Sequence, residues 1–239
     1  MSTTISGKVV AITGGTRGIG RAIAASLLQE GARVAICGTS QTSVDAALEE
    51  LAGLGELAGH VADVSVLADV QAFIAATMGR FGRIDAFINN AGVGTFRAAA
   101  ELTPEEWHHM LGVNLTGVYY CCHEILPIFK QQGGGDIINI SSLAGKNPFA
   151  RGAGYNATKF GLNGFSEATL LDHRQDGVRV SYVMPGSVAT EFAGEGAVSG
   201  ADWKIAPEDV ADVVRMLLTM PRRTTVSRVE IRPSRPQKG

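Results

Sequence analysis

Tyr155 and Lys159 stand four positions apart at the start of an expected helix. Residues with this spacing lie on one helical face, so we expect the phenol and the ammonium group to be close together. A nearby lysine cation favours the phenolate and lowers the tyrosine pKa from its usual ~10, which suits a general acid or base. A Tyr/Lys pair alone is common on exposed helices, so the interpretation depends on the residues around it.

Two further polar residues extend this candidate catalytic set. Ser142 follows an expected strand, where its hydroxyl could hold a substrate carbonyl oxygen as a fixed donor. Asn114 lies in the middle of an expected helix, and because asparagine is a poor helix former, this position invites a specific role. With a nicotinamide as the source of hydride, these side chains predict the interconversion of a carbonyl and an alcohol.

A glycine-rich turn earlier in the chain has the properties of a phosphate-binding loop. Residues 13–20 read TGGTRGIG and follow a run typical of a buried strand. Gly14, Gly18 and Gly20 permit positive φ and close approach of the backbone to a pyrophosphate, and the next helix offers free N–H groups. The spacing is not the literal GxGxxG fingerprint, and a merely tight turn is the alternative. The absence of a Gly-Lys-Ser/Thr sequence excludes a P-loop NTPase.

The residues after the second and third expected strands bear on the cofactor. An acid about 20 positions after the glycine turn would bind the ribose of NAD, but hydroxyls at Thr39 and Ser40 occupy this region. The missing acid, together with Arg17 in the turn, favours NADP(H) over NAD(H). Asp63 could receive the adenine amino group or, alternatively, cap the helix that begins near Ser65.

The composition and the order of elements predict one α/β domain. The chain has 239 residues, of which 45% are hydrophobic and 18% charged, with a net charge of −2 and 30 glycines. These values exclude wholesale disorder and argue against a nucleic-acid surface. Strand and helix patterns alternate throughout, which implies a single doubly wound Rossmann-like domain of residues 1–239 with helices on both faces of a parallel sheet. The expected strands are 8–13, 33–37, 57–63, 84–89, 136–140, 178–184 and 226–231, and the expected helices 18–30, 43–54, 66–81, 103–131, 153–176 and 207–219.

Targeting and metal signals are weak. The first residues show no signal peptide, and the apolar stretches fall far below the ~20 residues of a membrane span. Cys37, Cys121 and Cys122 do not form a disulfide framework, and the adjacent His108 and His109 lack accompanying metal ligands. We expect a cytoplasmic protein with a small-molecule substrate, no metal, and no nucleic-acid or membrane partner.

Taken together, the motifs resemble the short-chain dehydrogenase/reductase family over essentially the whole chain. The resemblance implies a sheet of seven parallel strands. It also implies that Tyr155 is the general acid/base, Lys159 binds the nicotinamide ribose and tunes Tyr155, Ser142 orients the carbonyl, and Asn114 holds a proton-relay water. The matching segments are TGGTRGIG (13–20), Asp63 with Val64, NNAG (89–92), Asn114, Ser142, YNATK (155–159) and PGSVAT (185–190).

The resemblance further implies an extended cofactor site. Thr190 and the backbone of Val188 would hold the nicotinamide carboxamide. The expected cofactor contacts are Gly14, Thr16, Arg17, Gly18, Ile19, Gly20, Thr39, Ser40, Asp63, Val64, Asn90, Ala91, Gly92, Tyr155, Lys159, Pro185, Gly186, Val188 and Thr190.

The substrate side is less specific. In this family the segment after Pro185 and Gly186 closes over substrate, so we expect a lid around 187–205, where Gly194, Gly196 and Gly200 suit a mobile segment. Candidate pocket walls are Leu143, Asn147, Phe149, Phe192 and Trp203.

Partners and alternative functions follow from the same resemblance. In related proteins the helices corresponding to 103–131 and 153–176 form a dimer interface, so we expect a homodimer or homotetramer. The turn at residues 38–40 resembles that of bacterial 3-oxoacyl-ACP reductases, while the C-terminal tail departs from that group. That reductase activity is one alternative. A non-catalytic NADP(H)-sensing protein is another, although such a protein is expected to lose Tyr155 or Lys159, and both are present.

Overall fold

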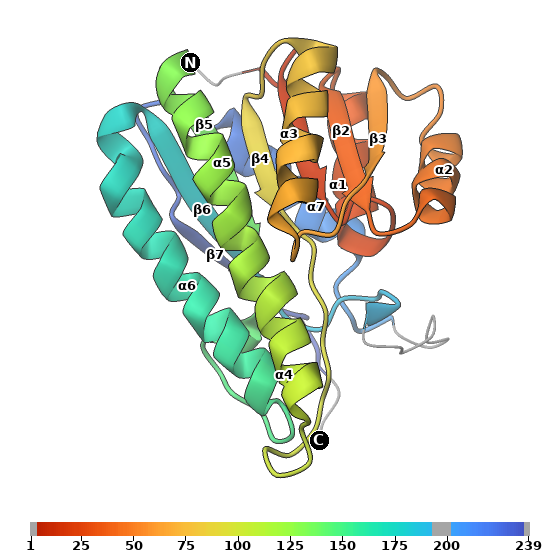
Figure 1. The fold of residues 1–239 in the computed structure, drawn as a ribbon, viewed down its shortest axis with the longest axis vertical. Coiled ribbons are helices and arrows are strands. Elements are labelled where there is room, and N and C mark those ends of the chain that lie inside the picture. The colour runs from red at the N-terminus through yellow and green to blue at the C-terminus, as the bar shows by residue number, and fades with distance from the viewer. Residues whose placement is uncertain (1–3, 193–201, 237–239) are drawn as a thin grey trace.

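The computed structural model describes residues 4–192 and 202–236. Seven strands form one parallel sheet in the order β3-β2-β1-β4-β5-β6-β7 (Figure 1). The chain first builds outward from β1 to β3, then returns to pair β4 with the other side of β1. This reversal creates the switch point at which ligands bind in open α/β sheets. The strands are β1 (Val9–Thr13), β2 (Arg33–Gly38), β3 (Leu57–Val61), β4 (Ala86–Asn89), β5 (Gly135–Ile140), β6 (Val178–Pro185) and β7 (Arg228–Ile231).

Helices cover both faces of the sheet. In β1, Val10 and Ile12 pack in the core cluster with α1, α2 and α7, whereas Val9 and Ala11 pack in the cluster with α3, α5 and α6 (Figure 1). Alternate strand residues therefore face opposite layers, as the two-residue period requires. The helices are α1 (Gly18–Gln29), α2 (Gln41–Glu50), α3 (Leu67–Phe81), α4 (Pro104–Leu111), α5 (Gly117–Gln132), α6 (Ala153–His173) and α7 (Pro207–Thr219).

Three helices differ from the sequence prediction by more than a residue at an end. The helix expected over residues 153–176 ends at His173, and a 3-10 turn at Arg174–Asp176 follows it. The helix expected over residues 103–131 is divided by a π-helical turn at Gly112–Thr116, although the capping box of Thr103 and Glu106 at its start is confirmed. The second helix begins at Gln41 rather than residue 43, because the Ser40 side chain accepts the N–H of Ser43. Both residues carry hydroxyls, and the backbone geometry decides which of them caps the helix.

A buried ion cluster lies at the amino end of the strands, opposite the candidate site. Asp136, at the start of β5, is only 4% exposed. Its carboxylate accepts hydrogen bonds from Arg179 Nε at 2.7 Å and Arg222 at 2.7 Å, and Lys8 Nζ lies 3.9 Å away. Arg179 also donates to the carbonyl oxygens of Met220 and Thr224, so this cluster ties β1, β5 and β6 to the segment after α7.

Within the described ranges, 4–192 and 202–236, the structure contains no helix that is long and apolar enough to cross a membrane.

Candidate active site

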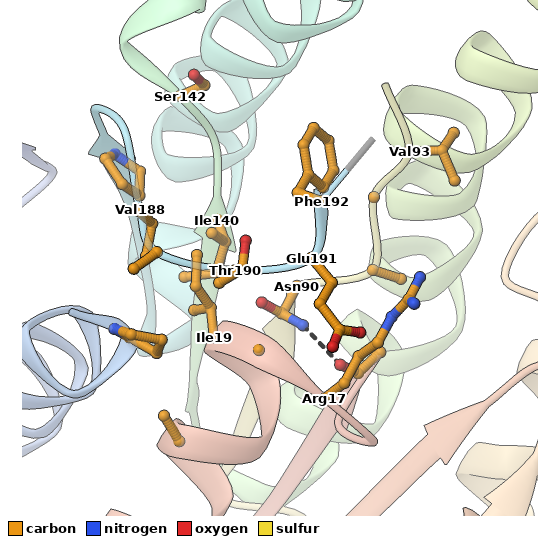
Figure 2. A pocket seen from close by; sticks show the side chains of 18 of the residues that line it. Arg17, Ile19, Asn90, Val93, Ile140, Ser142, Val188, Thr190, Glu191 and Phe192 are labelled. Atoms are coloured by element: carbon orange, nitrogen blue, oxygen red, sulfur yellow. Dashed lines mark hydrogen bonds between the residues drawn. The ribbon is translucent and has the colours of Figure 1, made fainter. Parts of the chain in front are cut away.

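A cleft of about 1510 Å³ opens at the carboxyl ends of the strands, and residues following β1 to β6 line it (Figure 2). Figure 2 shows Ser142, Phe192 and Val93 toward one end of this pocket and Arg17 toward the other. The structure brings most of the expected site residues together, because they line this one cleft. Those that do not line it are Gly20, Ser40 and Asn114.

The glycine turn is held by the segment that follows β4. Asn90 Nδ2 donates to the carbonyl oxygens of Thr13 at 3.0 Å and Gly14 at 2.9 Å. In return, Thr13 Oγ1 accepts the backbone N–H groups of Asn90 at 3.0 Å and Ala91 at 3.1 Å. These four bonds join β1 to β4 across the switch point. These bonds hold the turn against the segment that follows β4.

Two glycines in the turn are required by their surroundings. Gly14 has φ of 62°, and a Cβ there would lie 2.9 Å from Ala91 Cα. Gly20 faces inward from α1, where a Cβ would lie 2.2 Å from the Gly14 carbonyl oxygen. Gly20 is thus absent from the cleft lining because it packs α1 against the turn, and we assign it this packing role instead of cofactor contact.

The far end of the cleft carries the residues expected to select the cofactor. Arg17 is exposed immediately before α1, and Thr39 is exposed after β2; both line the cleft. Ser40 does not line it, because its side chain caps α2. Asp63 lines the cleft and also caps locally, since its Oδ1 accepts Ser65 N at 2.9 Å and Ser65 Oγ at 2.7 Å. Both interpretations of Asp63 are therefore compatible with its position.

Tyr155 and Lys159 occupy the first turns of α6, and both are buried in the cleft wall. Lys159 Nζ donates to the Ile140 carbonyl oxygen at 3.0 Å and lies 5.7 Å from the centroid of the Tyr155 ring. Ser142 lies two residues after the end of β5. Its Oγ accepts the Ala144 N–H at 3.1 Å, and its side chain also hydrogen-bonds the phenol of Tyr155. The three predicted side chains therefore meet at one end of the cleft.

The pKa values of this group differ from the expectation for Tyr155. Burial raises the pKa of the phenol to about 12, and the hydrogen bond from Ser142 opposes that change. Burial also lowers the pKa of Lys159 to about 8. The prediction that the tyrosine pKa falls below its usual value is therefore wrong for this structure, because removal of the phenol from water is the dominant influence.

Asn114 lies behind the cleft wall in the π-helical turn and is only 1% exposed. Its Oδ1 accepts Val93 N at 2.8 Å, and its Nδ2 donates to Val93 O at 2.8 Å and Thr158 Oγ1 at 3.1 Å. The side chain thus links the segment after β4 to α6. Because these partners occupy the amide, a water-holding role through this side chain stays a prediction, and positioning is the role its contacts support.

The segment after β6 forms the remaining wall. Val188 pairs with Ile205 in an isolated parallel bridge, and Thr190 lies close to Gly18, where a Cβ would approach the threonine methyl to 3.3 Å. Pro185 and Gly186 also line the cleft. The proposed pocket walls Leu143, Asn147, Phe149, Phe192 and Trp203 all line it as well. The expected lid glycines Gly194, Gly196 and Gly200 lie outside the described residues.

Several residues that support the site were not singled out from the sequence. Thr13 fixes the glycine turn, Thr158 joins Asn114 to α6, and Phe96 packs its ring against Tyr155 at 5.6 Å. Thr13 is the first residue of the glycine-rich motif and ends the strand before it, so the sequence could have indicated its supporting role. Phe96 lies in an irregular segment with no periodic pattern to mark it.

Comparison with known proteins gives independent evidence on the family. The model of the short chain dehydrogenase family matches residues 8–197. Levodione reductase of Leifsonia aquatica is 32% identical over 98% of this chain and 83% of its own.

Solved structures agree with this match. An alcohol dehydrogenase from Thermococcus sibiricus, complexed with 5-hydroxy-NADP, superposes with a TM-score of 0.89 at 32% identity, covering 97% of this chain and 99% of that one. A metagenomic short-chain oxidoreductase in complex with NADP is 39% identical with a TM-score of 0.85, covering 98% and 100% of the two chains. The fold, the cleft at the switch point and these matches lead to one conclusion: the chain belongs to the short-chain dehydrogenase family.

Proposed function

We propose that this protein is an NADP(H)-dependent oxidoreductase that interconverts a carbonyl and an alcohol, with Tyr155 as the general acid/base. One observation carries the proposal: Tyr155, Lys159 and Ser142 meet in the wall of the same cleft that the glycine turn lines. A dinucleotide that follows this cleft from the turn would bring its nicotinamide to these side chains.

The residues present fit a nicotinamide dinucleotide. Gly14 and Gly18 adopt positive φ of 62° and 53°. Because glycine has no side chain, the backbone at the start of α1 stays accessible to a pyrophosphate. The amino end of this helix offers N–H groups and a positive dipole to a pyrophosphate. When bound, the nicotinamide supplies or accepts the hydride.

The protein side chains would supply the proton for the reaction and hold the carbonyl oxygen of the substrate. In carbonyl reduction, Tyr155 donates its proton to the developing alkoxide, while Ser142 Oγ donates a hydrogen bond to the same oxygen. Lys159 uses one of its three N–H donors on Ile140 O, and the others remain for ribose hydroxyls or the phenol. Because burial raises the pKa of Tyr155 to about 12, the phenol is protonated at neutral pH and has a proton to donate in carbonyl reduction.

The activity test is NADPH oxidation followed by absorbance with a panel of carbonyls. The panel contains a 3-oxoacyl thioester, a 3-oxo acid, an open-chain ketone and an aryl ketone. Turnover of any member supports the proposal. Tight NADPH binding with no turnover across the panel would instead favour an NADP(H)-sensing protein.

Preference for NADP(H) is supported by Arg17, which is exposed in the cleft, and by the NADP complexes of two structural relatives. A hydrogen bond to a charged group contributes roughly 1.5–3 kcal/mol, so Arg17→Ala should weaken NADPH binding ~10- to 100-fold and leave NADH binding nearly unchanged. Arg174→Ala, an exposed arginine after α6, is the control. Equal losses for NADPH and NADH would contradict the assignment.

We further propose a homo-oligomer in which α5 and α6 form an interface. Tyr119 on α5 and Phe160 and Leu171 on α6 are 47%, 45% and 58% exposed. Light scattering after gel filtration should give a dimer or tetramer, and Phe160→Glu should dissociate it. Met216→Glu, on the exposed side of α7, should leave the mass unchanged. A wild-type monomer would overturn this proposal.

A further inference from the structure

Three phenylalanine rings from three separate segments gather near Tyr155: two of them contact its ring, and the third packs on one of those two. Phe96 meets Tyr155 edge-on, with ring centroids 5.6 Å apart and an interplanar angle of 87°. Phe192 lies 5.7 Å from Tyr155, and Phe149 lies 5.4 Å from Phe96. All four rings line the cleft. A substrate carbonyl within reach of the Tyr155 hydroxyl would therefore be next to aromatic surface.

Glycines position these rings. At Gly94, a Cβ would lie 2.7 Å from Phe192 Cε1 and 3.3 Å from Phe96 Cζ. At Gly152, a Cβ would lie 2.7 Å from Phe149 Cε2. An isolated parallel bridge between Arg97 and Gly152 joins the segment that carries Phe96 to the one that carries Phe149. The rings thus occupy places that the backbone leaves open, and two of their segments are held together.

The rings keep apolar surface open to the cleft. Phe96 is 36% exposed and Phe149 is 44% exposed, although both pack against other rings. Exposed aromatic side chains that line a concave site are typical of pockets for apolar ligands. A rigid apolar ring loses less conformational freedom on binding against these faces than a flexible chain of the same size does, and an aromatic ring can in addition pack edge-to-face or offset on them.

The cations on the same segments already have carboxylate partners. Arg97 Nε contacts Glu106 at 2.8 Å, Lys146 contacts Glu230 at 2.6 Å, and Arg151 contacts Glu101 at 3.2 Å. The lining of the cleft includes neither Arg97, Lys146 nor Arg151. The segments that carry Phe96 and Phe149 therefore contribute aromatic surface to the cleft. The arginine and lysine side chains of these segments form ion pairs with glutamates and do not line the cleft.

We infer that the substrate is a ketone whose carbonyl belongs to, or is attached to, an apolar ring. Phe96, Phe149 and Phe192 are the specificity-determining residues. This inference rests on the proposed carbonyl reduction at Tyr155 and adds the class of substrate to it. Open-chain 3-oxo acids and acyl thioesters would gain little from this aromatic surface and are expected to be poorer substrates.

The test compares ketones with the same number of carbon atoms: acetophenone, cyclohexyl methyl ketone and 2-octanone. We expect kcat/KM with NADPH to be about tenfold higher for the ring ketones, within the range by which apolar pockets discriminate. Phe96→Ala and Phe149→Ala should reduce this ratio to ~3 or less, with Phe96→Leu between them and the wild type. The affinity for NADPH should remain within about twofold, since the change is confined to the substrate side.

Controls separate a specificity effect from loss of structure. Met216→Ala, an exposed substitution on α7, should keep the wild-type ratio. Thermal unfolding should show that the Phe96 and Phe149 variants remain folded, because both rings are partly exposed. Binding of acetophenone and 2-octanone to the protein loaded with NADP+, which has no hydride to give to a ketone, is measured by calorimetry and gives a readout that is independent of turnover.

The outcomes distinguish this inference from the proposed function. Turnover of 2-octanone equal to or faster than that of the ring ketones would overturn the inference and leave carbonyl reduction intact. The same conclusion follows if both alanine variants keep the wild-type ratio. Failure of every carbonyl to react would instead overturn the proposed function, and calorimetry would still show whether the ring ketone binds more tightly than the open-chain one.

Discussion

The phenol of Tyr155 is buried, the Ser142 hydroxyl hydrogen-bonds it, and the Lys159 ammonium group lies near its ring. The proposed donation of the phenol proton to the substrate can be tested directly by removing this hydroxyl. We expect Tyr155→Phe to lower kcat for carbonyl reduction by ~10²- to 10⁴-fold, the usual contribution of a general acid. The affinity for NADPH, measured by fluorescence titration, should change little. Tyr119→Phe removes an exposed hydroxyl from α5 and should retain wild-type activity. Unchanged turnover in Tyr155→Phe would refute the assigned role.

Lys159 should make stability depend on pH in a defined direction. Its pKa falls from 10.5 to about 8 on burial, so above pH 8 the unfolded chain binds more protons than the folded one. The free energy of unfolding therefore rises with pH between 8 and 10, by up to ~3 kcal/mol for this shift. Above pH 10 the raised pKa of Tyr155 acts in the opposite sense.

Urea unfolding of the wild type and Lys159→Met across this pH range checks the prediction. The difference in unfolding free energy between the two proteins isolates the lysine, because their other titrating groups are the same. Lys159→Met should be the more stable protein at pH 7, and the gap should narrow as the pH approaches 10. A gap that is constant over the whole range would contradict a lowered lysine pKa.

At the scale of elements, the contact between α1 and the glycine turn is the tightest feature of the site. A Cβ at Gly20 would lie 2.2 Å from the Gly14 carbonyl oxygen and 2.4 Å from Asn90 Nδ2. Gly20→Ala must therefore shift the helix or break the Asn90 bonds to the turn. We expect at least ~10-fold weaker NADPH binding and a loss of ~1–3 kcal/mol in unfolding free energy.

Gly79→Ala is the matched control. Gly79 lies within α3, where an added Cβ meets nothing within 4 Å. Alanine is the better helix former by ~0.8–1.0 kcal/mol, so this variant should be slightly more stable and should bind NADPH normally. If both substitutions had the same effect, the close contact at Gly20 would not be the cause.

The elements also show how far the sequence was informative. The alternation of strand and helix patterns was sufficient to predict the sheet, and the capping box at Thr103 marked the start of α4. The π-helical turn around Asn114 was not predictable, because the apolar pattern runs through it without a break. β3 ends at Val61, short of the predicted residue 63, because the Asp63 N–H bonds the Asp69 carboxylate instead of the sheet.

In the candidate site, too, the sequence predicted the features that depend on local motifs and missed those that depend on distant residues. Motif spacing was enough to bring Tyr155, Lys159 and Ser142 together, since each stands at the end of a strand or the start of a helix. The pKa of Tyr155 was predicted in the wrong direction, because it depends on burial by residues distant in sequence. Phe96 approaches Tyr155 only through the path of an irregular segment, which no local pattern encodes.

At the scale of the whole molecule, stability and ligand binding are separated between the two ends of the sheet. Asp136→Ala would leave Arg179, only 7% exposed, without its carboxylate. Removing one partner of a buried pair costs ~3–5 kcal/mol, so urea unfolding should shift by this amount while NADPH affinity is retained. Asp212→Ala breaks an exposed pair with Arg215 and should cost ~0–1 kcal/mol. A large loss of NADPH affinity in Asp136→Ala would show that the two ends are coupled.

The strand order also has a consequence for the growing chain on the ribosome. β1 pairs on one side with β2, which follows closely, and on the other with β4, which is synthesised only after β2, α2, β3 and α3. Until Ala86–Asn89 emerges, one hydrogen-bonding edge of β1 is open, although every residue of this strand is buried in the folded protein, and such an edge can pair with other chains. Pairings between distant segments also slow folding. The reversal that creates the cleft therefore leaves β1, an interior strand, without one of its neighbours until Asn89 has been synthesised. Chaperones that cover this edge should raise the yield of the folded protein.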